Sequence, residues 1–280
     1  MNERKETSRV VFEECLKVRP GEKVLILTDR KKMHLARPLY DYGTTITDTV
    51  LRLIPVSRFD GDELRREDEE FCSGFDVILA PTTMSVSHTS AMVKARRKGA
   101  RVATMPGITD EIFDTALCTD YDALSKETKR LKAQLDGAVT IRVTSPGGTD
   151  LSCSTEGRLF HALDGCCHEP GCFVNLPDGE VMVAPVEESV YGRIVFDLSL
   201  MPDHRTSFGR IGLLSGERVI VEVRAGRIIS VTGGKKAEIF KNVLSAADDN
   251  ASTLAEFAIG TNRAARVIGN ILMDEKAAGT

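Results

Sequence analysis

Two glutamates in this sequence stand where an ionised side chain is costly. Glu180 follows a Pro-Asp-Gly turn and opens the apolar run 181–185, and Glu256 interrupts the apolar run 254–259. A carboxylate in apolar surroundings loses hydration energy unless a cation or hydrogen bonds compensate, and carboxylates of this kind are what a hard or borderline divalent metal requires. Both glutamates are therefore candidate metal ligands, although by pattern alone a solvated glutamate at the start of a strand is the favoured interpretation of Glu180.

A second cluster is metal-like by residue type. Cys166, Cys167, His168 and Cys172 lie within seven residues, and thiolates with imidazole are zinc ligands. Their spacing differs from that of a closed zinc knuckle, and no second cysteine and histidine pair follows downstream. A structural thiol cluster is therefore favoured over a zinc site.

Composition and missing motifs exclude several functions. The formal net charge of −4 gives no overall field that attracts nucleic acid or an anionic membrane. No Gly-x-Gly-x-x-Gly or Gly-x-x-x-x-Gly-Lys-[Ser/Thr] motif is present, so dinucleotide and P-loop sites lack their phosphate cradle. No run approaches the roughly 18 apolar residues of a membrane helix. The N-terminal segment 1–8 is polar, and the seven cysteines are scattered. We therefore expect a cytoplasmic protein with reduced thiols.

The elements that must position these residues differ between the two halves of the chain. In the first half, short apolar runs alternate with helical patterns; the predicted strands are 23–28, 50–54, 76–80 and 100–104, and the predicted helices are 33–42, 62–71 and 87–98. This alternation predicts a three-layer α/β domain with a parallel sheet. Asp120 is a candidate cap for a further helix that carries Leu124, Leu131 and Leu135 on one stripe.

The second half has the alternation typical of antiparallel strands. Strands are predicted at 139–143, 192–197, 217–223 and 226–231, with a hairpin turn at 224–227 and helices at 237–244 and near 262–269. We therefore predict an α/β chain with an N-terminal domain over 1–136 and a β-rich α+β metal-binding domain over 137–280.

Three segments carry a resemblance to a known family. Residues 175–185 (Asn-Leu-Pro-Asp-Gly-Glu-Val…Ala-Pro), 255–262 (Ala-Glu-Phe-Ala-Ile-Gly-Thr-Asn) and 269–276 (Gly-Asn-Ile-Leu-Met-Asp-Glu-Lys) resemble the thermophilic aminopeptidase (aminopeptidase T) family of metallopeptidases. Segments 103–109 and 144–150 add support. The similarity follows the order of the family's motifs over essentially the whole chain.

The resemblance implies a metal-dependent aminopeptidase that releases N-terminal residues from peptides and forms a homodimer. Glu180 and Glu256 match the family's metal ligands for zinc, cobalt or manganese, and metal-bound water would attack the scissile carbonyl. No catalytic residue is assigned. Family members continue beyond the segment that matches 274–280 into one with a ligand histidine and a His-x-Asp pair. By the same resemblance, the chain is a C-terminally truncated member.

Two alternatives stay open. A related branch, the dihydroxypyridine ring-opening dioxygenases, shares the Glu-Phe-x-Ile-Gly-Thr-Asn type of motif and uses one non-haem iron held by two histidines and a carboxylate. The other alternative is a non-catalytic relative that serves in binding or assembly.

Overall fold

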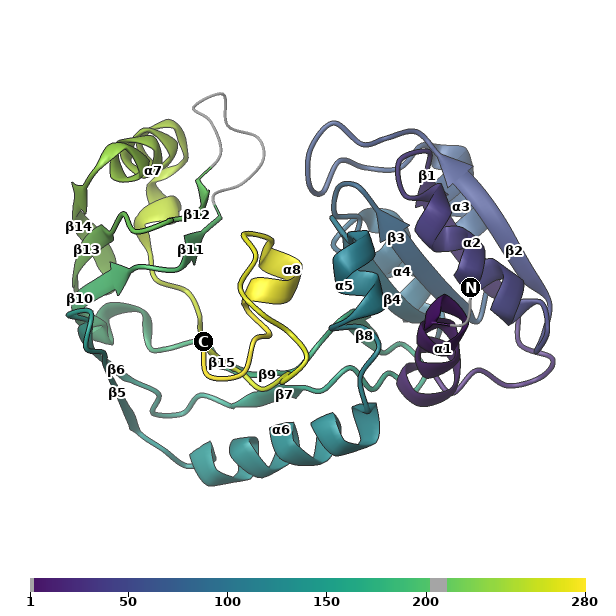
Figure 1. The fold of residues 1–280 in the computed structure, drawn as a ribbon, viewed down its shortest axis with the longest axis horizontal. Coiled ribbons are helices and arrows are strands. Elements are labelled where there is room, and N and C mark those ends of the chain that lie inside the picture. The colour runs from purple at the N-terminus through teal and green to yellow at the C-terminus, as the bar shows by residue number, and fades with distance from the viewer. Residues whose placement is uncertain (1–2, 202–210) are drawn as a thin grey trace.

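The computed structural model describes residues 3–201 and 211–280. Met1 and Asn2, which begin the polar N-terminal segment, lie outside these ranges. A parallel sheet with its helices lies at one side of the molecule and an antiparallel sheet at the other, and the C-terminal segment runs between them (Figure 1). Within the described residues, no helix has the length and apolar character needed to cross a membrane.

The predicted parallel sheet is confirmed. Its five strands follow the order β2-β1-β3-β4-β8. They are β1 (Val24–Asp29), β2 (Thr49–Ile54), β3 (Val77–Thr82), β4 (Arg101–Pro106) and β8 (Phe173–Asn175). The first four are the predicted strands, and all are paired in parallel. β8 comes from the second half of the chain and pairs with β4. The predicted domain boundary at 136/137 stays a prediction.

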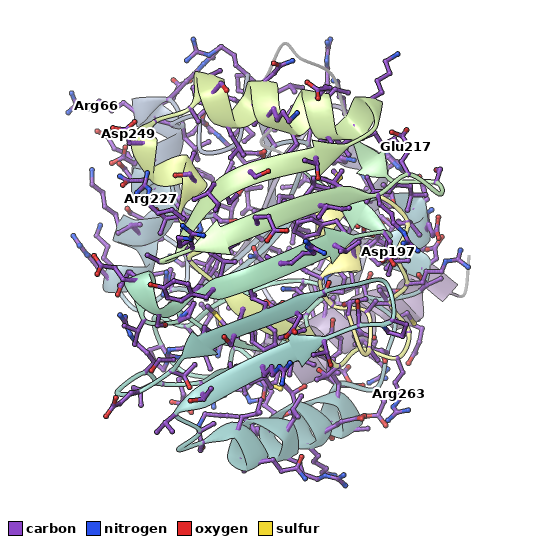
Figure 2. All side chains as sticks on the ribbon, turned by 90° about the vertical axis from the view of Figure 1, so that its left-hand side faces the viewer. Arg66, Asp197, Glu217, Arg227, Asp249 and Arg263 are labelled. Carbon is purple, nitrogen blue, oxygen red and sulfur yellow. The ribbon has the colours of Figure 1, made fainter. Side chains whose placement is uncertain are left out.

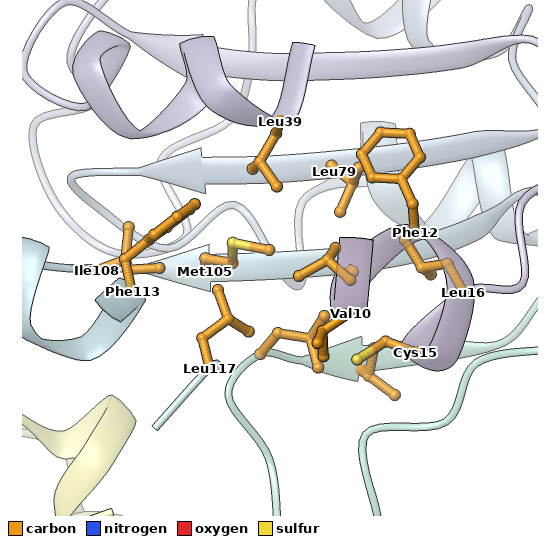
Figure 3. Packing of buried hydrophobic residues seen from close by; sticks show 14 of the residues in the cluster. Val10, Phe12, Cys15, Leu16, Leu39, Leu79, Met105, Ile108, Phe113 and Leu117 are labelled. Atoms are coloured by element: carbon orange, nitrogen blue, oxygen red, sulfur yellow. The ribbon is translucent and has the colours of Figure 1, made fainter. Parts of the chain in front are cut away.

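Helices cover both faces of this sheet, because its buried strands are apolar on both sides. One face packs against the π-helix η1 (Val10–Cys15), α2 (Met33–Gly43) and α5 (Asp110–Asp114). The first helix, α1 (Glu3–Arg9), contacts α2 and α5. Figure 3 shows this packing, with Phe12 and Leu39 above Leu79 and Met105 of the sheet. The other face packs against α3 (Arg66–Cys72) and α4 (Ser90–Arg97). The three predicted helices 33–42, 62–71 and 87–98 are thus present.

The second half contains the predicted antiparallel sheet, in the order β14-β13-β10-β6-β5. Its strands are β5 (Thr140–Thr144), β6 (Asp150–Ser154), β10 (Tyr191–Phe196), β13 (Val219–Arg224) and β14 (Arg227–Gly233). The inner face buries valines such as Val219 and Val221 against α7 (Lys235–Ala246). The outer face, turned to the viewer in Figure 2, carries the Arg142–Asp150 and Arg193–Glu222 ion pairs.

A small third sheet joins the two halves and carries the candidate site. Its order is β15-β9-β7, formed by β15 (Phe257–Gly260), β9 (Glu180–Val183) and β7 (His161–Leu163). One face packs on the long helix α6 (Tyr121–Leu135) through Val181 and Val183. Asp120 caps α6 by accepting from the Ala123 amide at 2.9 Å, as predicted. Alternation along β9 leaves the Glu180 side chain on the face opposite to α6.

One predicted helix is wrong. Residues 262–269 form turns and irregular chain, and a short helix, α8 (Ile271–Asp274), follows them. The Asp274 carboxylate accepts from the backbone amides of Ile268 and Gly269 at 2.7 and 3.0 Å, so these amides are not available for a helix ladder. The remaining elements are β11 (Ser199–Leu200), β12 (Gly212–Leu213), η2 (Glu187–Ser189) and η3 (Asp249–Ser252).

The predicted hairpin turn provides a test of the fold. At Gly226 the backbone has φ +74°, and an added Cβ would lie 1.6 Å from the Glu187 carbonyl oxygen. We expect Gly226→Ala to lower the free energy of unfolding by about 3 kcal/mol, because left-handed strain adds to a steric clash. At Gly61, with φ +79°, an added Cβ would meet nothing within 4 Å. Gly61→Ala should therefore cost only about 1 kcal/mol. Equal losses in urea unfolding would contradict the close approach to Glu187.

Candidate metal-binding site and its cavity

The three motif segments of the second half meet beneath α8. The Asn262 amide donates to the Lys276 carbonyl oxygen at 2.8 Å, and the Thr261 amide donates to the Gly179 carbonyl oxygen at 2.8 Å. Strands β9 and β15 pair so that Glu180 lies opposite Gly260. At Gly260 an added Cβ would lie 2.1 Å from the Ala277 carbonyl oxygen, which leaves room for glycine alone. The strand that begins at Glu180 is thereby fixed beside the Gly-Thr-Asn segment, 82 residues further along the chain, and that segment beside the one that ends at Lys276.

A buried ion pair lies at the centre of this meeting point. Lys276 Nζ donates to Glu180 Oε1 at 2.6 Å, and the two residues are 2% and 3% exposed. The second carboxylate oxygen, Oε2, is buried without a hydrogen-bond partner among the described residues. Glu180 is therefore neither the solvated strand-start residue favoured by pattern alone nor fully satisfied by its protein neighbours. One oxygen is held by a cation of the protein itself, and the other has no partner within residues 3–201 and 211–280.

Lys276 also faces two further carboxylates. Its Nζ lies 2.9 Å from Glu275 Oε1 and 3.7 Å from Asp178 Oδ1. Burial disfavours the ionised carboxylates, so the pKa of Asp178 rises to about 6 and that of Glu180 to about 7, against the opposing charge of Lys276. Burial alone would lower the pKa of Lys276, but the three carboxylates raise it above its ordinary value. The ammonium ion is thus charged at neutral pH.

Asn262 fixes the turn that precedes Glu180. Its side-chain amide is fully buried and donates to the Asp178 carbonyl oxygen at 3.0 Å and to the Ala116 carbonyl oxygen at 3.1 Å. Its Oδ1 accepts from the Ala264 amide at 2.9 Å. The asparagine of the Gly-Thr-Asn segment therefore satisfies backbone groups of three separate segments. Its role in this structure is to position the site.

The second predicted ligand, Glu256, lies apart from Glu180 along the strands. Glu256 directly precedes β15 and is four residues from Gly260, the partner of Glu180. At about 3.4 Å per residue, the backbone of Glu256 is about 14 Å from that of Glu180 along the direction of the strands. Glu256 is exposed at the surface; partial desolvation and the charge of Glu275 raise its pKa. That both glutamates bind one metal centre stays a prediction.

A cavity of about 490 Å³ lies beside the buried ion pair. Glu275, which contacts Lys276 at 2.9 Å, belongs to its wall. The wall thus has three acidic residues, Asp197, Asp274 and Glu275. Ala258 of β15, also in the wall, lies on the face that carries Glu180. The rest of the wall is mainly apolar and includes Val195, Phe196, Leu198, Leu200, Met201, Val267 and Ile271. A largely apolar cavity with a few convergent polar groups is the usual form of a small-molecule site.

The residues present fit a metal ion only in part. The free, buried Oε2 of Glu180 has the chemistry of a ligand for a divalent cation. Across residues 3–201 and 211–280, however, no three histidine, cysteine, aspartate or glutamate side chains are grouped so that they could hold an ion. Lys276 takes the other oxygen of Glu180. The described residues therefore supply one carboxylate ligand and not a complete coordination shell.

The cysteine cluster contains no ligand arrangement for zinc in the described chain. His168 Nε2 lies 2.8 Å from the Glu14 carbonyl oxygen. Cys166, Cys167 and Cys172 are free thiols. The cysteine segment leads into β8, the strand that the second half of the chain adds to the parallel sheet, because Cys172 directly precedes β8.

Comparison with known families matches the chain over most of its length. A family model described as 2,5-dihydroxypyridine 5,6-dioxygenase (NicX) covers residues 62–279. The chain belongs to the 2,5-dihydroxypyridine 5,6-dioxygenase family. All three motif segments lie inside the matched region, so the buried Glu180–Lys276 pair is a feature of this family member. No curated protein matches the chain.

Solved structures share the fold of this dioxygenase-family chain. A 2,5-dihydroxypyridine dioxygenase from Pseudomonas putida KT2440 superposes with a TM-score of 0.79 at 17% identity, over 99% of this chain and 83% of that one. AmpT from Thermus thermophilus superposes with a TM-score of 0.66 at 16% identity, over 99% of this chain and 84% of that one. At such low identity the likeness concerns the fold. The expected resemblance is confirmed for both branches, the aminopeptidase T type and the dihydroxypyridine dioxygenases.

Sequence reasoning missed the partners of Glu180. Lys276 and Glu275 end the segment 269–276, which carries only the resemblance, and the sequence predicts Asp178 only as a turn residue. The local sequence carries no signal for this role, because Lys276 directly follows two acidic residues, Asp274 and Glu275, in a segment as polar as an exposed turn. What the sequence could not show is that this cation and the Glu180 carboxylate neutralise one another.

The ion pair predicts a large asymmetry between two lysine variants. We expect Lys276→Met to lower the free energy of unfolding by about 3–5 kcal/mol, because it leaves buried carboxylates without their counter-ion. The control is Lys132→Met, which removes an ion pair 2.7 Å long between partly exposed side chains and should cost less than about 1 kcal/mol. Adding Glu180→Gln to Lys276→Met should restore part of the loss in urea unfolding. An additive double variant would show that the two charges are not coupled.

Proposed function

We propose that this chain is a metal-dependent enzyme that opens the ring of a hydroxylated pyridine with molecular oxygen. The observation that carries the proposal is the family match over residues 62–279, which includes every segment around Glu180. The metal in this proposal is iron. Dioxygen reacts slowly with closed-shell aromatic rings, and a redox metal supplies the missing reactivity.

The geometry around the cavity supports a small aromatic substrate. The cavity volume of about 490 Å³ falls within the range of small-molecule sites, roughly 300–1,000 Å³. Its apolar wall, with Phe196 and Ile271, suits the faces of a planar ring. Asp197 and Glu275 on the same wall are acceptors for ring hydroxyl groups. These features support a single ring with hydroxyl substituents.

The proposed roles of the chain's own residues follow from their contacts. Glu180 offers its free Oε2 as a metal ligand, and Lys276 keeps the other oxygen fixed at 2.6 Å. Such support of a ligand by a neighbouring group determines its orientation and its basicity. Asn262 holds the turn before Glu180 through its bond to the Asp178 carbonyl oxygen. Because the described residues form an incomplete coordination shell, no reaction step is assigned to the metal.

The proposal is tested by oxygen consumption. Protein loaded with iron(II) under argon should consume oxygen when 2,5-dihydroxypyridine is added, with loss of the ring absorption. Glu180→Gln should reduce this rate by more than about 100-fold, since even groups that only support a ligand typically contribute 10–100-fold. The matched control is Glu127→Gln, which changes an exposed glutamate paired with Arg263 and should leave the rate unchanged. Iron-loaded protein that consumes no oxygen with this substrate would reject the dioxygenase assignment.

A second candidate is the metal-dependent aminopeptidase expected from the resemblance. It is favoured by the fold shared with AmpT at a TM-score of 0.66. Glu275 in the cavity wall, whose charge also acts on Glu256, suits the α-ammonium group of a peptide. Protein loaded in turn with zinc, cobalt and manganese should then hydrolyse leucine p-nitroanilide, and Glu256→Gln should raise KM. Absence of hydrolysis with all three metals, together with oxygen consumption with iron, would decide for the first function.

Location and assembly are part of the proposal. All seven cysteines are free thiols, which supports a reducing compartment such as the cytoplasm. The homodimer expected from the resemblance is testable by light scattering of the purified chain.

A further inference from the structure

The segment between Cys167 and Cys172 is folded so that it brings the two cysteines together. The Cys172 amide donates to the Glu169 carbonyl oxygen at 3.1 Å, and Gly171 has φ +77°. With Pro170 second and Gly171 third, these features are those of a type II turn. The turn reverses the chain between the two cysteines.

Contacts with β4 and with elements that flank the parallel sheet hold this segment; the Val102 amide of β4 donates to the Cys172 carbonyl oxygen at 3.0 Å. The Cys167 amide donates to the Cys15 carbonyl oxygen at 2.7 Å, and the Gly171 amide donates to the Gly99 carbonyl oxygen at 3.0 Å. Arg96 Nε donates to the Gly171 carbonyl oxygen at 3.2 Å. Both ends of the segment are therefore fixed. The Cys172 thiol itself lies against the backbone next to Cys167, where it donates to the Cys166 carbonyl oxygen at 3.9 Å.

The two thiols interact directly and are not equivalent. Cys167 is fully buried, whereas Cys172 is half-buried. A hydrogen bond from the Cys167 thiol lowers the pKa of Cys172, and the charge of Arg96 lowers it further; the same bond raises the pKa of Cys167. A partly accessible thiolate beside a resolving thiol is the usual environment of a reactive cysteine.

Four other cysteines, Cys15, Cys72, Cys153 and Cys166, lack this environment. Burial raises the pKa of Cys15, of Cys153 and of Cys166, and raises that of Cys72 to about 12. A thiol that stays protonated is a poor nucleophile. Cys166 is a useful comparison because it is half-buried like Cys172 and lies in the same segment.

We propose that Cys167 and Cys172 form a redox-active dithiol that hydroperoxides convert to a disulfide. The Cys172 thiolate attacks the peroxide O–O bond, so that an S–O bond forms, the O–O bond breaks and hydroxide leaves as water after taking up a proton. The Cys167 thiol, after losing its proton, attacks the resulting sulfenic acid, so that an S–S bond forms and a second water leaves. Two thiols are oxidised, and one hydrogen peroxide is reduced to two waters.

This modification site is separate from the proposed function. Cys172 lies at the start of β8, and none of the residues that line the cavity or contact Glu180 belongs to the 167–172 segment. The test therefore uses the chemistry of the thiols, with no enzymatic readout.

The experiment is treatment of the purified protein with one equivalent of hydrogen peroxide, followed by intact mass and peptide analysis. We expect a loss of two hydrogen atoms and a Cys167–Cys172 link that dithiothreitol reverses. Cys166→Ser, the matched control, should retain this loss. Cys172→Ser should react with peroxide at least about tenfold more slowly. Cys167→Ser should form no disulfide and should accumulate a sulfenic acid that dimedone traps.

Several outcomes would overturn the proposal. They are a wild-type mass that does not change, a disulfide that instead joins Cys166 to another cysteine, and an unchanged peroxide rate in Cys172→Ser. Because the link is mapped in the wild-type protein, the result does not depend on the folding of any variant.

Discussion

The neutralisation of Glu180 by Lys276 is the interaction on which the candidate site depends. Two charges that are almost completely buried can be tolerated only as a closely bonded pair, here at 2.6 Å. The pair joins β9 to the segment that follows α8. The helix α8 itself contributes Leu272 and Met273 to the core of the parallel-sheet half. The same contact thus gives the site its charge balance and fastens the C-terminal segment to the small central sheet.

The asymmetry of the Glu180 carboxylate relates this structural contact to function. One oxygen is bound by the protein's own cation, and the other is buried and free among the described residues. An unsatisfied buried oxygen costs free energy, and functional sites are where proteins retain such costs. Family membership and the nearby cavity give this oxygen a chemical context. The shared fold does not by itself decide between oxygen chemistry and peptide hydrolysis, because one fold can host both.

The two glutamates illustrate how far a motif leads. The sequence predicts both as metal ligands, and the structure places Glu180 in β9 and Glu256 directly before the paired strand β15. Their environments differ, since Glu180 is buried against Lys276 and Glu256 is exposed beside Glu275. Burial is decided by the segment that packs over each residue. For Glu180 that segment lies 96 residues away, beyond the reach of any local pattern.

The sequence by itself determined the local elements. Apolar runs fixed the first four strands of the parallel sheet, Asp120 fixed the start of α6, and the turn at Ala225 and Gly226 fixed a hairpin, because these signals act over a few residues. Only the tertiary structure decided that residues 262–269 form no helix, that β8 joins the first sheet, and that Lys276 rather than solvent faces Glu180. Each of these depends on contacts between distant segments. Their free energy comes from burial and charge pairing and not from local propensity.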